Sequence, residues 1–147
     1  MNEAIAQAKI SLKKKEVPIG AIVVHNGKII AKGHNMREKR KNALLHAEII
    51  AINKACKKLK DWRLENCELY VTLEPCPMCA GAIANARIKK VVFAAKEKTS
   101  CDNLCEKILT SNRLNHKCEI VQATEFEEKC SKMLTEFFKS KRKNASQ

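Results

Sequence analysis

Two short motifs in this sequence carry side chains that can bind a metal ion. His46-Ala47-Glu48 supplies an imidazole and a carboxylate, and Pro75-Cys76-Pro77-Met78-Cys79 supplies two thiols. Each motif alone is weak, because a Cys-x-x-Cys pair also occurs in redox sites and in structural zinc sites. Together they provide one imidazole and two thiolates, a ligand set that suits zinc. We therefore predict that His46, Cys76 and Cys79 bind one Zn²⁺ per subunit.

The number of ligands indicates what such a zinc would do. Structural zinc is usually closed by four protein ligands, whereas three ligands leave one position open for water. Zinc lowers the pKa of bound water from about 15.7 to about 7, which provides hydroxide at neutral pH. Glu48 could take the proton from that water and deliver it to a substrate. Alternatively, Glu48 has no catalytic role and is an acidic residue of the kind favoured in the first turn of a helix. The complete set of three metal ligands favours the catalytic role.

Periodicity and turn residues predict the elements that must position these motifs. We expect helices over 1–12, 46–59, 78–86 and about 125–143, and strands over 17–24, 28–33, 69–73, 91–93 and 119–123. The order predicts an α/β fold, a three-layer α/β/α sandwich around a central mixed five-stranded sheet, with a right-handed parallel crossover over 69–93. We expect one domain over 1–147, with a basic C-terminal helix and a short polar tail at 144–147.

The composition of the chain indicates which class of binding partner it has. The 147 residues suffice for one domain, and 29 Lys and Arg against 16 Asp and Glu give a net charge of +13. This excess favours a polyanion, nucleic acid before a membrane surface, although a genome biased towards lysine would raise the charge as well. We see neither a signal peptide nor an apolar run of membrane-spanning length. We expect a cytoplasmic protein without a membrane partner and with reduced cysteines.

The remaining cysteines allow two interpretations. Cys101 and Cys105, with His116 and Cys118, could form a second, structural zinc site. Scattered thiols are more often small apolar residues of the core, and we favour that interpretation. We also assign to the core the cysteines on apolar faces: Cys56, Cys67 and Cys130.

Longer segments around the two motifs point to one family. They are EVPIGA at 16–21, HAEI at 46–49, LYVTLEPCPMCAGAIANAR at 69–87, IKKVVF at 88–93, RLNH at 113–116, and Phe137-Phe138 with the basic residues that follow. His-x-Glu followed by Pro-Cys-x-x-Cys is the signature of zinc-dependent nucleobase deaminases. Over nearly its whole length the sequence resembles the bacterial tRNA-specific adenosine deaminases, which have a cytidine deaminase-like fold.

This resemblance implies an activity and a set of site residues. The expected reaction is hydrolytic deamination of adenosine to inosine at the wobble position (34) of a tRNA anticodon, with release of ammonia. His46, Cys76 and Cys79 match the family's zinc ligands, and Glu48 matches its proton shuttle. Asn35 matches an asparagine that contacts the purine, and the Ala47 amide would lie near the product oxygen. The residues expected to bind RNA are Phe137, Phe138, Lys141, Arg142 and Lys143.

The resemblance also implies a homodimer that binds the tRNA anticodon stem-loop, but three segments depart from the family pattern. Asn42-Ala43-Leu44-Leu45 replaces an Asp-Pro-Thr-Ala run, Ala94-Ala95 replaces Gly-Ala, and residues 98–103 replace a glycine-rich loop. These departures leave the predicted metal ligands intact. We expect them to alter the rim around the substrate.

Two other functions remain compatible with the motifs. A deaminase of free nucleobases or nucleosides, guanine or cytosine, would use every one of the same catalytic residues. The net charge of +13 and the basic tail favour RNA, because a small neutral substrate needs neither. The second alternative is a zinc-stabilised RNA-binding module without catalysis. Glu48 and the open coordination position argue against it.

Overall fold

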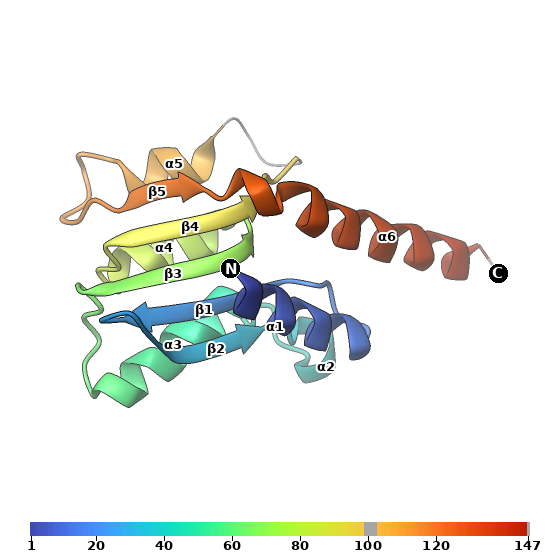
Figure 1. Cartoon of the computed structure of the whole chain (residues 1–147), viewed down its shortest axis with the longest axis horizontal. Coiled ribbons are helices and arrows are strands. Elements are labelled where there is room, and N and C mark those ends of the chain that lie inside the picture. Colours follow the sequence, from blue (N-terminus) through green and yellow to red (C-terminus); the bar gives the residue numbers. More distant parts are fainter. Residues whose placement is uncertain (99–102, 147) are drawn as a thin grey trace.

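A five-stranded mixed sheet forms the centre of the molecule (Figure 1). The computed structural model describes residues 1–98 and 103–146. The strands are β1 (Gly20–His25), β2 (Lys28–His34), β3 (Cys67–Leu73), β4 (Lys90–Ala95) and β5 (Glu119–Gln122), in the order β2-β1-β3-β4-β5. β1 pairs antiparallel with β2 and β3, whereas β3-β4 and β4-β5 are parallel. The expected mixed sheet and the parallel β3–β4 pairing are confirmed.

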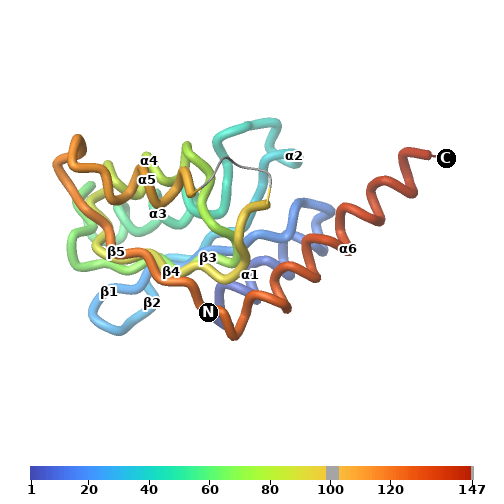
Figure 2. Tube along the Cα trace, turned by 90° about the horizontal axis from the view of Figure 1, so that it is seen from above, coloured from blue at the N-terminus to red at the C-terminus, as the bar shows by residue number. Residues whose placement is uncertain are grey.

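Helices cover both faces of this sheet. The helices are α1 (Asn2–Lys13), α2 (Arg37–Arg40), α3 (Ala47–Leu59), α4 (Pro77–Asn85), α5 (Leu104–Leu109) and α6 (Glu127–Ala145), with a 3₁₀ turn at Thr124–Phe126. Figure 2 shows α3, α4 and α5 together on one side of the sheet, while α1 and the start of α6 lie on the other. The expected three-layer α/β/α sandwich is therefore confirmed.

Alternation along the strands divides the core between the two faces. On β3, Cys67, Leu69 and Val71 are fully buried in the larger cluster, which the sheet shares with α3 and α4. Such alternation is expected because successive strand residues point to opposite faces. A smaller cluster on the other face joins Ile5 of α1 to Cys130 of α6. Apolar contacts thus anchor both α1 and α6 to this face of the sheet.

Gly33 explains how α3 lies so close to the sheet. A Cβ atom at this position of β2 would collide with the carbonyl oxygen of Ala47 and with the backbone of Ala51. Only glycine permits such an approach between backbones. The first turn of α3, which follows His46, is therefore pressed against β2.

The structure differs from the expected elements at several places. β1 begins at Gly20 because the preceding residues leave the sheet, where Ile19 N–H donates to the Val17 carbonyl. α2 and α5 were not expected, since neither short helix has a clear apolar period. α6 ends at Ala145, so part of the expected polar tail is helical. Residues 99–102 of the altered 98–103 loop lie outside the described residues.

α6 leaves the body of the protein after its first turns and ends far from the sheet (Figures 1 and 2). Its outer end carries the basic residues Lys141, Arg142 and Lys143, which are exposed. Within residues 1–98 and 103–146, no helix combines the length and apolar character that crossing a membrane requires.

Candidate active site

His46, Cys76 and Cys79 meet where two helices begin. His46 is the residue before α3 and Cys76 is the residue before α4, so both lie at helix N-termini. His46 Nδ1 lies 3.6 Å from Cys76 Sγ and 3.6 Å from Cys79 Sγ. One possible ligand atom from each residue lies within 4.8 Å of the other two. The cluster could hold a metal ion, and it unites all three residues that the motifs suggested.

The local sequence explains how the two thiols converge. Cys76 has extended backbone angles, φ −68° and ψ 169°, and Pro77 occupies the first helical position. Proline fits there because its missing N–H would have no partner within the helix. Cys79 follows three residues after Cys76, a spacing that places both side chains on the same side of the first turn. The positive end of the helix dipole favours a thiolate at this point.

The thiols of Cys76 and Cys79 interact, and their pKa values shift in opposite directions. A hydrogen bond from the Cys79 side chain, together with His46, lowers the pKa of Cys76 to about 4 although burial opposes this shift. The same contact and burial raise the pKa of Cys79, and the contact with Cys76 raises that of His46. Metal binding to thiols and imidazole displaces such protons. The cluster therefore has the donor chemistry of a cation site.

Glu48 lies in the first turn of α3 and is only 4% exposed. Burial raises the pKa of its carboxyl group to about 7. In the part of the chain that the structure describes, Glu48 Oε2 is the buried side-chain oxygen without a hydrogen-bond partner. An unpaired buried oxygen is unfavourable, and proteins seldom keep one without a use. Its place beside the cluster fits a group that exchanges protons with a bound molecule.

A pocket of about 410 Å³ opens beside the cluster. His46 and Ala47 form part of its wall, which joins the pocket to the metal-ligand candidates. Ala95 at the end of β4, the residues 96–98 that follow it and one side of α6 also line the pocket. Apolar residues contributed by three different segments include Val17, Ile19, Leu73 and Leu134. The volume and the mainly apolar lining suit a small planar ligand.

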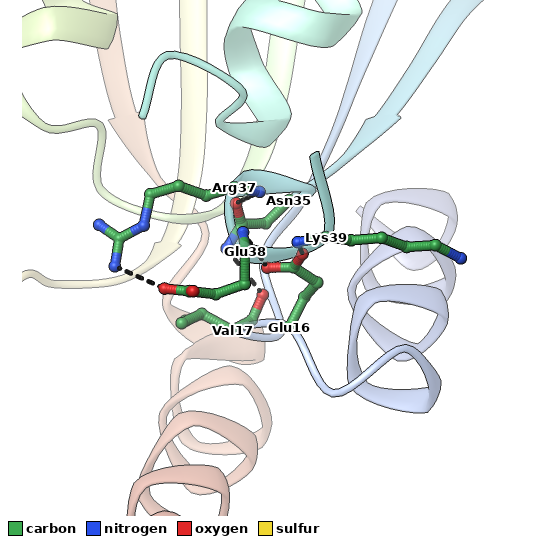
Figure 3. A network of polar contacts seen from close by, with 6 residues as sticks. All are labelled: Glu16, Val17, Asn35, Arg37, Glu38 and Lys39. Carbon is green, nitrogen blue, oxygen red and sulfur yellow. Dashed lines mark hydrogen bonds and ion pairs between the residues drawn. The ribbon is translucent and has the colours of Figure 1, made fainter. Parts of the chain in front are cut away.

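Asn35 lines this pocket directly after β2 and is 6% exposed. Its Oδ1 accepts the backbone N–H of Arg37 at 3.2 Å, and its Nδ2 donates to the Val17 carbonyl at 3.4 Å (Figure 3). Ala47, also suggested by the resemblance, is fully buried at the start of α3. Its N–H belongs to the first turn, where backbone donors lack intrahelical partners.

The adjacent residues Phe137 and Phe138 of α6 have different environments. Phe138 lines the pocket, and 47% of its surface is exposed. Phe137 is buried, with only 7% of its surface exposed. Their rings meet edge to face with centroids 5.4 Å apart. Lys141 Nζ lies 5.6 Å from the Phe137 ring centre. The structure thus places Phe138, but not Phe137, where a ligand could contact it.

Three cations at the pocket were not singled out by the sequence patterns. Arg37, Lys96 and Lys98 line its opening from two sides. Arg37 belongs to the basic run 37–41, which by itself looks like an ordinary solvated surface. Only the fold brings Arg37 of this run to the same pocket as residues 96–98.

The other cysteines behave as core residues. Cys105 and Cys118 are 5% and 4% exposed within the main apolar cluster, and burial raises the pKa of each to about 12. His116 Nε2 contacts the Ile88 carbonyl at 2.6 Å. Cys101 lies outside the described residues. Among the residues described, the one metal-ligating cluster of three or more is that of His46, Cys76 and Cys79.

Comparison with known proteins agrees with this geometry. Residues 1–142 match the MafB19-like deaminase family. The chain is 50% identical over 144 residues to the tRNA-specific adenosine deaminase of Bacillus subtilis, covering 97% of this chain and 89% of that relative.

Two solved structures are similar to this chain, one over nearly its whole length and one over about two thirds of it. One, from studies of A-to-I editing by tRNA:A34 deaminases, superposes with a TM-score of 0.84 at 32% identity, covering 91% of this chain and 97% of the other. A guanine deaminase from Bacillus subtilis gives a TM-score of 0.62 at 42% identity, but covers only 65% of this chain and 61% of the other. The chain therefore belongs to the MafB19-like deaminases and, within them, to the family of tRNA-specific adenosine deaminases.

Proposed function

We propose that this protein hydrolyses adenosine to inosine at the wobble position of a tRNA anticodon and releases ammonia. The observation that carries the proposal is a buried carboxylate, Glu48, beside a three-residue metal-ligand cluster at the wall of a pocket. The substrate class is supported by the 50% identity to a tRNA-specific adenosine deaminase over nearly the whole chain.

We propose zinc as the metal that His46, Cys76 and Cys79 hold. Two thiolates and one imidazole suit zinc better than they suit magnesium or calcium, which prefer oxygen ligands. Zinc bound by three protein ligands supplies a site at which water loses a proton near neutral pH. The unpaired Oε2 of Glu48 fits this interpretation, because it provides a proton acceptor beside the cluster.

Glu48 moves the protons of the reaction. Its pKa of about 7 allows the carboxyl group to exist in both protonation states near neutral pH. It takes a proton from the water that attacks C6 of adenine and gives one to the neighbouring ring nitrogen. It then takes the remaining proton from the hydroxyl group added at C6 and passes it to the departing amine, so that the C6 carbonyl forms as the C6–N bond breaks and ammonia leaves. Water supplies the oxygen of inosine, so adenosine and water are converted to inosine and ammonia.

The pocket holds and orients the base. The apolar side chains of Val17, Ile19 and Leu134 offer contact to a planar ring, and Asn35 adds polar atoms at its edge. The N–H of Ala47 is available for the oxygen that forms at C6. The base must leave its stack to enter, which is easier from a single-stranded loop than from a duplex.

The rim of the pocket is suited to the nucleotides around that base. Exposed Phe138 can stack on a neighbouring base. Arg37, Lys96 and Lys98 at the opening, with the basic end of α6, can pair with phosphates. We propose a cytoplasmic location, with which a tRNA substrate is consistent. Assembly as a homodimer remains a prediction, which sedimentation analysis of the protein alone would test.

One experiment separates the proposed function from its alternatives. The zinc-loaded protein is incubated with an anticodon stem-loop carrying adenosine at position 34, with the same stem-loop carrying guanosine there, and with free adenosine, guanine and cytosine. We expect inosine and ammonia from the first substrate alone. Turnover of guanine or cytosine would favour a free-base deaminase. Stem-loop binding without ammonia would favour a non-catalytic RNA-binding module.

A further inference from the structure

Glu16 follows α1 and is held there by the way that helix ends. Lys15 adopts left-handed backbone angles, with φ 61°, and its N–H donates to the Leu12 carbonyl at 3.0 Å. The Glu16 N–H donates to the Ser11 carbonyl, also at 3.0 Å. Together these two bonds form the Schellman arrangement at a helix C-terminus. The backbone of Glu16 is therefore fixed, and the residue is only 1% exposed.

The buried carboxylate of Glu16 binds the start of a helix that lies far away in sequence. Oε1 accepts the backbone N–H of Lys39 at 2.6 Å, and Oε2 accepts that of Glu38 at 3.2 Å (Figure 3). Both donors lie in the first turn of α2, where backbone N–H groups have no partner within the helix. Hydrogen bonds to an ionised acceptor are stronger than those between neutral groups. Glu16 thus fastens α2 to the end of α1.

The fastened helix in turn holds Asn35. The N–H of Arg37, the first residue of α2, donates to Asn35 Oδ1, and Asn35 Nδ2 donates to the carbonyl of Val17, the neighbour of Glu16. The buried hydroxyl of Ser11 donates to the Asn35 carbonyl at 3.1 Å. The side chain of Asn35 therefore lies between the two segments that Glu16 joins (Figure 3). Its donor and acceptor are both oriented by that junction.

We propose that Glu16 is a positioning residue for base binding: it fixes α2, and α2 fixes Asn35 and Arg37 at the pocket. The inference rests on the proposed function, since it takes the pocket to hold the adenine. Glu16 itself is absent from the described residues that line the pocket, and it belongs to no part of the metal-ligand cluster. Its loss should therefore weaken substrate binding and leave proton transfer by Glu48 intact.

Hydrogen exchange tests the first step without any substrate. Glu16→Gln keeps the size of the side chain but offers one good acceptor in place of two. We expect the amides of Glu38 and Lys39 to exchange about 10-fold faster, while the amides of α3 keep their rates. The matched control is Glu3→Gln in α1, which removes the same charge from an exposed ion pair with Lys32 of β2. Unchanged exchange at both amides would overturn the proposal.

Kinetics test the second step. Glu16→Gln should raise KM for the adenosine stem-loop about 10-fold, the size of one lost charge-assisted hydrogen bond. We expect kcat to stay within about twofold and the zinc content to stay unchanged. In an Asn35→Ala background, most of the further change in KM should vanish, because Asn35 is the residue at this junction that we propose contacts the base.

Three results would overturn the role of Glu16: the same change in KM with and without Asn35, a loss of kcat at unchanged KM, or a fall in melting temperature alone. Glu16→Asp keeps the charge but shortens the side chain, and it replaces Glu16→Gln if the latter does not fold. If the wild-type protein forms no inosine from the stem-loop, the proposed function fails. The exchange rates at Glu38 and Lys39 still decide whether Glu16 fastens α2.

Discussion

The metal-ligand cluster and the rim of the pocket are built in different ways. The cluster comes from two short motifs, each at the N-terminus of a helix that packs on the same face of the sheet. The rim comes from the segment that follows α1, the α2 turn, residues 95–98 and one side of α6. The groups proposed for the chemistry are therefore placed by local structure. Those proposed for substrate recognition depend on contacts between distant segments.

Burial follows this division in part, since His46 and Cys76 are half-buried and Asn35 at the pocket is only 6% exposed. Cys79 is fully buried and Glu48 is 4% exposed, whereas the side chain of Arg37 is 50% exposed and Phe138 is 47% exposed. A buried cluster tolerates little change, because each atom is in contact with others. An exposed rim tolerates more. The departure from the family pattern at 42–45 is consistent with this, since it falls outside the cluster.

The largest effect should come from the cluster. Cys76→Ser should abolish zinc binding and inosine formation, because a hydroxyl is a poor replacement for a thiolate ligand. Zinc content by atomic absorption and ammonia release measure both. Cys56→Ser, at a partly exposed thiol away from the cluster, should retain one zinc and normal turnover. If the Cys76→Ser protein keeps one zinc per chain, Cys76 is not a zinc ligand.

Glu48→Gln should separate metal binding from proton transfer. The variant should keep its zinc but lose on the order of 10²–10⁴-fold in kcat, since an amide cannot carry the proton. Single-turnover measurement of inosine gives the rate. Glu65→Gln, at an exposed position, serves as the control for loss of one negative charge. Near-normal turnover without the Glu48 carboxylate would show that its assigned role is wrong.

The basic end of α6 should contribute to the salt dependence of RNA binding. Replacing the three cations at 141–143 with glutamine should reduce the slope of log K against log salt by about 2, if each cation contacts one phosphate of a single strand. Fluorescence anisotropy with a labelled stem-loop measures the slope. Glutamine at Lys57, Lys58 and Lys60, near the far end of α3, removes the same charge elsewhere. An equal change of slope in both triple variants would show that the salt dependence reflects net charge and not contacts made by the end of α6.

The smallest effect should distinguish the two adjacent phenylalanines. Phe138→Ala should raise KM for the stem-loop about 10-fold, through lost stacking, with little change in melting temperature. Phe137→Ala should instead lower the free energy of unfolding by about 3–5 kcal/mol, because it empties a buried site. Kinetics and thermal unfolding of both variants make the comparison. The opposite assignment of the two effects would contradict the placement of α6.

Sequence patterns predicted the strands and long helices well because each has a regular apolar period. They placed His46 and Cys76 at helix starts, since a Pro at the first position and an apolar face beyond mark such boundaries. They did not indicate α2, whose four residues Arg37–Arg40 are all charged. A helix this short has no apolar stripe, and its stability comes from a distant carboxylate that no local pattern contains.

The same limit applies to individual residues. Phe137 and Phe138 are identical neighbours, and only the packing of α6 buries one ring and exposes the other. Glu16 was noted as part of a family segment, but its two bonds to α2 appear only in the folded chain. Arg37 and Lys98 likewise share a pocket that neither local sequence indicates.

The sequence by itself indicated the candidate metal ligands, the carboxylate that we propose for proton transfer, and the order of the long helices and strands. These features depend on residue types at fixed short spacings, which a helix start or a strand converts directly into geometry. Tertiary structure alone decided which cations and which aromatic ring reach the pocket, and how Glu16 secures its edge. Such contacts join segments far apart in the chain, so they exist only after the sheet has brought α1, α2 and α6 together.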